Sequence, residues 1–432
     1  MRRRYGPRMR GGVAAVFVTA LALALVGAAP GSSSPGAQAG IQDDAWLLYG
    51  PGTLSQRLTT LDDLGVQVVR FTLRWDKVAP TRPASPRRST DPAYRWGAFG
   101  DVLDGLHALG IPALVTLYGS PRWANGHQAS NRLPLAGFGD FAYAAAKRFP
   151  WVRMWTAWNE PNSRTFAVPV SPAAYVRRVL NPAYASLHSA SRANRVGGGE
   201  TSPRATPSGM SPLAFMSGMR AAHARLDAYA QHPYPVDRRE TPLRTTCAQC
   251  GYFTLARLAD IRADVTRYFG AKPLWLTEYG YQTNPPDRLL GVSYALQASY
   301  IGEAALHVWE QPGVTVLIQF LVRDEPSAGG WQSGLFTVRG ARKPAYQAFA
   351  LPLAERARRG SQALLWGQVR PGAGRRTYVL QRSTGGLWSP AGSAAQTDTR
   401  GMFTRTVPLP PGTRVRISAP SLGWVGPALT LF

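Results

Sequence analysis

Short apolar runs alternate with amphipathic stretches from residue 40 to about residue 355. Runs rich in β-branched and aromatic residues predict eight strands, at 45–49, 67–72, 111–117, 152–158, 195–199, 228–232, 273–277 and 314–320. Apolar positions at helical spacing predict helices at 53–64, 99–109, 172–191, 213–226, 254–269 and 293–309. Gly65 and Gly110 stand where the first two of these helices should end. Such alternation predicts an α/β fold around a parallel sheet.

The number of these units favours a closed barrel. Eight strand–helix units in about 310 residues suit a (β/α)8 TIM barrel, which typically needs about 250 residues plus insertions. From residue 361 the helical period is lost, and short alternating runs at 363–369, 377–382, 403–407 and 414–418 predict a small all-β module, a β-sandwich. We therefore expect one domain, the TIM barrel, at 40–356 and a second, the C-terminal β-sandwich module, at 357–432.

The N-terminal segment has the pattern of a secretion signal. Five arginines among the first ten residues precede an apolar run at 13–26, and Ala37-Gln38-Ala39 matches a small-x-small cleavage site. The pattern predicts a signal peptide at 1–39, a mature chain that starts near Gly40, and a secreted, extracellular protein. An uncleaved membrane anchor is the alternative, which the shortness of the apolar run disfavours. We expect no stable membrane insertion after cleavage.

The chain is strongly basic, with a net charge of +25 that is almost entirely due to arginine. The arginines are scattered and are not interleaved with aromatic residues, so the sequence predicts no nucleic-acid partner. Attraction to anionic glycans or to a negatively charged cell surface fits the charge better.

The chain has two cysteines, Cys247 and Cys250. In an extracellular protein such a pair is expected to close a small disulfide loop. A zinc site would need two further ligands at suitable spacing, which the sequence does not offer. A redox role would need a thioredoxin-like context, and the sequence around the pair does not have one.

Two predicted strands end in a glutamate. Glu160 follows the fourth strand in WTAWNEPN, and Glu278 ends the seventh in LWLTEYGYQT. A carboxylate at the end of a buried strand is costly unless the protein uses it. Because the carboxyl ends of barrel strands meet at one mouth, both glutamates should face the same site. A pair of carboxylates there is the equipment of a glycoside hydrolase.

The segments WNEPN and TEYG resemble the signatures of glycoside hydrolase clan A, the retaining (β/α)8 enzymes that include families 39 and 5. The resemblance covers roughly residues 41–355, and WNEPN leans towards family 39. It implies that Glu160 is the acid/base and Glu278 the nucleophile, and that Asn159 binds the sugar 2-hydroxyl. It also carries over His232 and Tyr234, with an ordinary strand-end turn as the alternative, and Arg70, which is equally consistent with a structural ion pair.

Further candidates come from the loops at the expected mouth. Tyr118, Trp123 and Trp331 are candidates to stack on sugar rings, although loop aromatics as often serve packing. Glu200 ends the fifth strand and is a candidate either to support the site from behind or to bind substrate. The end of the eighth strand, Gln319-Phe320-Leu321, departs from the tryptophan that is usual in the clan, and Asp324 and Glu325 follow it as possible substrate contacts. The sequence offers no metal-ligand spacing and no phosphate-binding loop, so we expect no metal and no cofactor.

These features together predict a secreted retaining glycoside hydrolase that cleaves β-glycosidic bonds in a polysaccharide or oligosaccharide. Carbohydrate is therefore the expected partner. A transglycosylase that remodels a cell-surface glycan would use the same residues. A carbohydrate-binding protein with weak catalysis is the other alternative, and the presence of both glutamates speaks against it.

Overall fold

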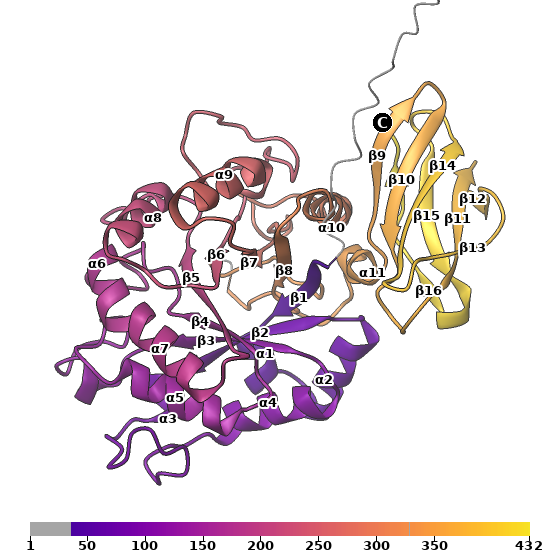
Figure 1. Ribbon diagram of the computed structural model, residues 1–432. Coiled ribbons are helices and arrows are strands. Elements are labelled where there is room, and N and C mark those ends of the chain that lie inside the picture. Colours follow the sequence, from indigo (N-terminus) through magenta and orange to yellow (C-terminus); the bar gives the residue numbers. More distant parts are fainter. Residues whose placement is uncertain (1–35, 328) are drawn as a thin grey trace, which may run out of the picture. The chain divides into compact units, whose positions relative to one another are not determined.

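Eight parallel strands form a closed barrel in the order β1 to β8, which confirms the predicted TIM-barrel fold (Figure 1). The computed structural model describes residues 36–327 and 329–432, so most of the expected secretion signal, up to residue 35, lies outside the described residues. The barrel strands are β1 (Gln38–Gln42), β2 (Val68–Arg74), β3 (Ala113–Tyr118), β4 (Met154–Ala157), β5 (Arg195–Thr201), β6 (Ala228–Gln231), β7 (Leu274–Tyr279) and β8 (Val314–Phe320).

Helices follow the strands and cover the outside of the barrel. The predicted helices are found as α2 (Leu54–Asp63), α4 (Gly97–Ala108), α6 (Pro172–Tyr175) with α7 (Asn181–Ala190), α8 (Pro212–Ala221), α9 (Leu258–Phe269) and α10 (Tyr294–Trp309). A π-helical turn at Val176–Leu180 joins α6 to α7. The sequence reading missed α1 (Asp44–Tyr49), α3 (Trp75–Val78), α5 (Phe138–Arg148) and α11 (Pro344–Ala350).

The first strand was predicted wrongly. Residues 45–49 belong to helix α1, and the strand that closes the barrel is β1, which pairs with β2 on one side and with β8 on the other. Asp43 starts the helix, because its side chain accepts a hydrogen bond from the backbone of Trp46 at 2.9 Å. A short apolar run fits a buried strand or a buried helix equally well, and here the capping residue decides.

Small residues on some strands make room for large ones on others inside the barrel. Trp275, Val68, Leu114 and Ile318 belong to the apolar cluster formed by the inward-facing residues of the strands. A Cβ atom on Gly197 would lie 2.8 Å from the ring of Trp275, so this position in β5 admits only glycine without movement of its neighbours. Gly197 in β5 therefore compensates for the tryptophan in β7, whereas Gly198 makes room for Leu180 and Gly199 for Tyr229.

The C-terminal residues form an antiparallel module, as predicted. One sheet has the order β14-β10-β9 and the other β12-β11-β15-β16. The strands are β9 (Leu353–Arg359), β10 (Gln362–Gln368), β11 (Thr377–Thr384), β12 (Leu387–Pro390), β13 (Ala395–Gln396), β14 (Met402–Pro408), β15 (Arg414–Ala419), β16 (Trp424–Val425) and β17 (Leu429–Thr430). Trp366 of β10 packs with Ala305 and Leu306 of α10, so the module shares an apolar cluster with the barrel.

The loop after β6 carries the two cysteines. Cys247 and Cys250 form a disulfide, as the sequence predicted. Among the helices of the described residues, none combines the length and apolarity that a bilayer span requires.

Candidate active site

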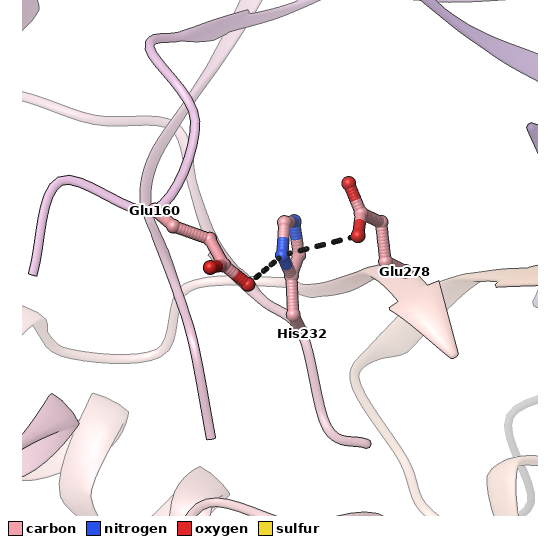
Figure 2. Close-up of side chains that lie close together, drawn as sticks. All are labelled: Glu160, His232 and Glu278. Carbon is pink, nitrogen blue, oxygen red and sulfur yellow. Dashed lines mark hydrogen bonds and ion pairs between the residues drawn. The ribbon is translucent and has the colours of Figure 1, made fainter. Parts of the chain in front are cut away.

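Glu160, His232 and Glu278 come together at the C-terminal mouth of the barrel. Glu160 follows β4, His232 follows β6, and Glu278 lies near the end of β7. Figure 2 shows the imidazole of His232 between the two carboxylates. Its Nδ1 lies 2.9 Å from Oε1 of Glu160 and 3.5 Å from Oε2 of Glu278. A carboxylate oxygen of each glutamate and a ring nitrogen of His232 all lie within 4.8 Å of one another. The two glutamates predicted to face one site are therefore close together in the structure.

Arg70 of β2 lies at the centre of the polar network beneath this pair, and its side chain is fully buried. One guanidinium nitrogen, Nη1, contacts Glu278 at 2.5 Å and also donates to Gln42 of β1. The Nε and Nη2 atoms donate to Glu200 at 3.0 Å and to Asn159 at 2.8 Å. The planar fork of an arginine suits such a junction, because it offers five donors in fixed directions. Arg70 thereby joins strands β1, β2, β5 and β7 and the turn after β4.

Tyr234 completes the contacts of Glu278. Its hydroxyl donates to Oε2 at 2.9 Å, while Arg70 contacts Oε1. Burial, followed by the charge of Glu278, raises the pKa of Tyr234 well above its usual range, so the hydroxyl keeps its proton. Each oxygen of Glu278 thus has its own donor, which fixes the orientation of the carboxylate.

Burial raises the pKa of the Glu160 carboxyl, and the nearby charge of Glu278 raises it further. The hydrogen bond and charge of His232 oppose this rise. Burial alone would lower the pKa of His232, but the charge of Glu278, the hydrogen bond with Glu160 and the nearby carboxylate of Glu200 raise it to about 9. The net effect is a pKa of Glu160 above the ordinary value of a glutamate, beside an imidazole whose pKa is also raised.

Glu200 at the end of β5 supports the site from below. Although burial opposes its ionisation, the charge of Arg70 and the nearby imidazole of His232 hold the pKa of Glu200 below its usual value. Its carboxylate is buried as the counterion of Arg70 and does not line the cavity. Of the two positions expected for Glu200, supporting the site or binding substrate, the structure has the first, since Glu200 contacts Arg70 and not the cavity.

The backbone is strained where β4 and β5 end. Trp158, Glu160 and Glu200 have positive φ angles of 79°, 38° and 50°. Non-glycine residues in this region cost about 1–2 kcal/mol each, so the surrounding structure has to hold them there. A backbone hydrogen bond of 3.0 Å from the amide of Glu160 to the carbonyl of Glu200 is one such restraint. Strain of this kind is typical of functional sites.

A cavity of about 500 Å³ opens above the two glutamates. Six of the residues selected from the sequence line it, namely Tyr118, Asn159, Glu160, Tyr234, Glu278 and Trp331. Arg70 and His232 lie beneath its floor. Trp123 does not line the cavity: its indole N–H donates to the carbonyl of Ala79 at 2.8 Å, and its ring packs edge-on against Trp75. Asp324 and Glu325 also lie outside the lining.

An aromatic wall stands beside Tyr234. Phe320 at the end of β8 packs edge-on against Tyr234, with 6.0 Å between ring centroids. Trp331, from the loop after β8, lies 4.7 Å from Tyr234 and 5.8 Å from Phe320. Strand β8 has no tryptophan at its end, and Trp331 supplies an indole to the same region from the loop.

Five non-aromatic polar residues of the cavity lining were missed in the sequence, namely Gln42, Asp44, Thr72, Arg74 and Lys77. The first two follow or end β1, so the mistaken strand at 45–49 hid them. Arg74 is the last residue of β2, and Lys77 lies in α3 directly after it. Both follow the strand predicted at 67–72, and residues in that position of a barrel face the mouth, so their place in the sequence could have identified them.

The cluster of Glu160, His232 and Glu278 also has the spacing of a cation site. Its chemistry does not fit one. The raised pKa of His232 leaves a proton on the nitrogen that would bind the ion, and the guanidinium of Arg70 already contacts Glu278.

The chain is thus a (β/α)8 barrel with two glutamates at its C-terminal mouth, one after β4 and one near the end of β7. Solved structures share this fold. A monomeric β-xylosidase from Caulobacter crescentus matches with a TM-score of 0.59 and 17% identity, over 90% of this chain and 96% of its own. A family 39 glycoside hydrolase from Bacteroides cellulosilyticus matches with a TM-score of 0.59 and 15% identity, over 88% of this chain and 80% of its own.

A family 5 enzyme from Streptomyces cattleya, solved with GlcNAc, matches with a TM-score of 0.54 and 17% identity, over 74% of this chain and 79% of its own. The likeness to all three lies in the fold. No protein-family model matches the sequence, and no curated protein matches it.

Proposed function

We propose that the protein is a retaining glycoside hydrolase that cleaves β-glycosidic bonds by double displacement. The observation that carries the proposal is the close approach of Glu160 and Glu278. A carboxylate oxygen of Glu160 lies within 4.8 Å of a carboxylate oxygen of Glu278, and a ring nitrogen of His232 lies within the same distance of both. Retaining enzymes hold their two carboxyl groups about 5–5.5 Å apart, whereas inverting enzymes need about 6.5–9.5 Å to admit a water molecule. The short separation therefore favours retention.

The environments of the two glutamates support different roles. Glu160 has a raised pKa and faces the cavity, so it suits the acid that protonates the leaving oxygen. Glu278 is held by Arg70 and Tyr234, so it suits the nucleophile that attacks the anomeric carbon. The bond to the leaving group breaks as the ester to Glu278 forms. Glu160 then takes a proton from the water that attacks the same carbon and releases Glu278.

The experiment is azide rescue of two variants with an aryl β-glycoside that has an activated leaving group. In Glu278→Ala, azide should attack from the vacated face and give a glycosyl azide with one inversion. In Glu160→Ala, azide should intercept the glycosyl-enzyme, so that two inversions give net retention. The anomeric configuration of each product is read by NMR.

A matched control is Glu310→Gln, since Glu310 is a partly exposed glutamate that pairs with Arg356 away from the site. It should keep the activity of the unmodified protein. Full activity in both alanine variants would refute the assignment of the site, and exchanged stereochemistries would reverse the two roles.

We also propose that the protein is secreted and acts on a polysaccharide or oligosaccharide outside the cell. The arginine-rich start of the chain and the apolar run at 13–26 support secretion. The aromatic wall of Tyr234, Phe320 and Trp331 supports a carbohydrate substrate, because the apolar faces of sugar rings pack on aromatic side chains.

A further inference from the structure

A second cavity, of about 620 Å³, lies at the end of the barrel opposite the glutamates. It is bounded by the C-terminal ends of α8 and α9 and by the segments that lead into β6 and β7. The two helices lie next to each other on the outside of the barrel (Figure 1). Leu226 and Lys272 precede β6 and β7, whereas Tyr234 follows β6 and Glu278 comes late in β7, so this cavity is separate from the active site.

The lining of this cavity is cationic. It includes Arg220, Arg225, Arg267 and Lys272, and no aspartate or glutamate belongs to the described lining. None of these four side chains makes an ion pair or a hydrogen bond within the described residues, whereas Arg74, Arg148 and Arg356 elsewhere are paired with carboxylates. Two of the four, Arg220 and Arg267, lie in the last turns of their helices, where a cation stabilises the helix end. That effect does not explain Arg225 and Lys272.

The nearest acids do not neutralise the group. Asp227 accepts hydrogen bonds from His188 and from the backbone of Val196, both at 2.8 Å. Asp264 is close enough to Arg267 for the two charges to interact, but it lies outside the cavity lining. The cavity therefore offers a surplus of unpaired positive charge.

Two tyrosines hold part of this charge in place. The guanidinium of Arg225 lies over the ring of Tyr184, 4.5 Å from its centroid, and that of Arg267 lies 5.4 Å from the ring centroid of Tyr268. Such stacking restrains the arginines without using their N–H donors. It also covers one face of each ring, so these rings are poor platforms for the stacked bases of a nucleic acid.

We propose that this groove binds an acidic polysaccharide through carboxylate or sulfate groups spaced along the polymer. Free guanidinium and ammonium donors match both kinds of anion. Four cations around one cavity of about 620 Å³ suit a repeating anion better than a single small ion. The groove would hold the polymer while the separate mouth of the barrel meets a glycosidic bond, but binding itself does not depend on the proposed hydrolysis.

The test measures binding of the full chain to three polymers at low ionic strength: polygalacturonate, dextran sulfate and neutral dextran. The first two should bind and the third should not, and binding should weaken with added salt. Arg225→Ala combined with Lys272→Ala should weaken binding of the acidic polymers by about tenfold. The acidic polymer whose affinity falls more in this variant identifies the anionic group, carboxylate or sulfate, that the cavity binds.

The matched control is Arg82→Ala combined with Arg375→Ala, which removes two exposed, unpaired arginines elsewhere and the same amount of charge. It should weaken binding by less than about twofold. Equal losses in the two double variants, or equal binding of neutral dextran, would overturn the proposal. Tighter binding of duplex DNA than of either acidic polymer, lost in the groove variant, would also overturn it. Turnover of a small aryl glycoside should be unchanged in both variants, so failure of the proposed catalysis is read separately.

Discussion

Among single residues, His232 has the clearest effect on the pKa of Glu160. It is buried, carries a pKa raised to about 9, and donates to Glu160 at 2.9 Å. A cation and a donor beside Glu160 favour its ionised form and so lower its pKa, against the effect of burial. Activity that depends on protonated Glu160 is lost as the pH rises through the pKa of this group.

We therefore predict that His232→Asn moves the alkaline limb of the kcat/KM profile to higher pH. The substitution removes the cation, so the pKa of Glu160 rises further and the acid keeps its proton over a wider range. The measurement is a pH–rate profile with a substrate whose poor leaving group requires protonation. Tyr234→Phe is the control: it loses a contact to Glu278, so kcat should fall by roughly tenfold to hundredfold with the alkaline limb unmoved. A shift to lower pH in His232→Asn would contradict the prediction.

Arg70 contacts two buried carboxylates and an amide of the site with one guanidinium group. Its contacts to Glu200, Glu278 and Asn159 use all three guanidinium nitrogens, so a lysine cannot replace them. We predict that Arg70→Lys lowers the free energy of unfolding by about 3–5 kcal/mol, because it leaves buried carboxylates without partners. Urea denaturation gives this value, and kcat/KM should fall by at least about a hundredfold.

The comparison variant is Arg74→Lys, whose parent side chain is partly exposed and pairs with Asp76. It should cost less than about 1 kcal/mol. Similar stabilities of the two variants would mean that the Arg70 network does not hold the barrel mouth together.

At the scale of elements, the loop after β8 depends on a buried ion pair. Nζ of Lys343 donates to Asp324 at 2.7 Å, to Thr283 at 2.9 Å and to the carbonyl of Gln332 at 3.0 Å. Gln332 follows Trp331, which stands in the aromatic wall of the cavity. The ion pair therefore fixes the segment that presents the indole to the substrate.

We predict that Lys343→Met raises KM more than it lowers kcat, because the position of Trp331 is loosened while the glutamates stay in place. Removing one member of a buried pair should also lower the free energy of unfolding by about 3–5 kcal/mol. Steady-state kinetics and thermal unfolding measure the two effects. Adding Asp324→Asn removes the unpaired charge but keeps the acceptor for the amide of Gly334, so it should restore part of the stability. An unchanged KM in the single variant would refute the link to Trp331.

At the scale of the whole molecule, closure of the barrel restricts where the N-terminus can be processed. Residues Gln38 and Ala39 lie in β1 and pair with Val316 and Leu317 of β8. The amide of Ala39 also donates to the side chain of Gln67 at 2.8 Å. Cleavage between Ala39 and Gly40 would take two residues from a five-residue strand at the seam of the barrel.

We accordingly predict that the secreted chain begins before Gln38, which refines the start near Gly40 that the cleavage pattern suggested. N-terminal sequencing of protein from the culture medium tests this directly. A chain made to begin at Gly36 should melt several degrees above one that begins at Gly40, since the longer form keeps every β1–β8 pair. A natural start at Gly40 with unchanged stability would contradict the prediction.

The repeating strand–helix pattern, the all-β module and the pair of strand-end glutamates could be predicted from the amino-acid sequence alone. These features are local: periodicity, strand length and a carboxylate after a buried run are visible in short windows. The same locality explains the error at β1, where the run at 45–49 satisfied the rules for a strand and only the pairing of Gln38–Gln42 with β8 showed which segment closes the barrel.

Which side chains meet depends on the three-dimensional packing of the chain. Arg70, Glu200 and Glu278 come from three strands and His232 from the turn after a fourth, and their mutual distances depend on barrel closure. The pKa of Glu160 is likewise set by burial and by His232, neither of which its neighbours in sequence reveal. Trp123 and Trp331 looked alike as loop aromatics, yet one packs behind the site and the other lines it. A sequence specifies which groups are available, and packing in three dimensions sets the distances and desolvation that give those groups their chemistry.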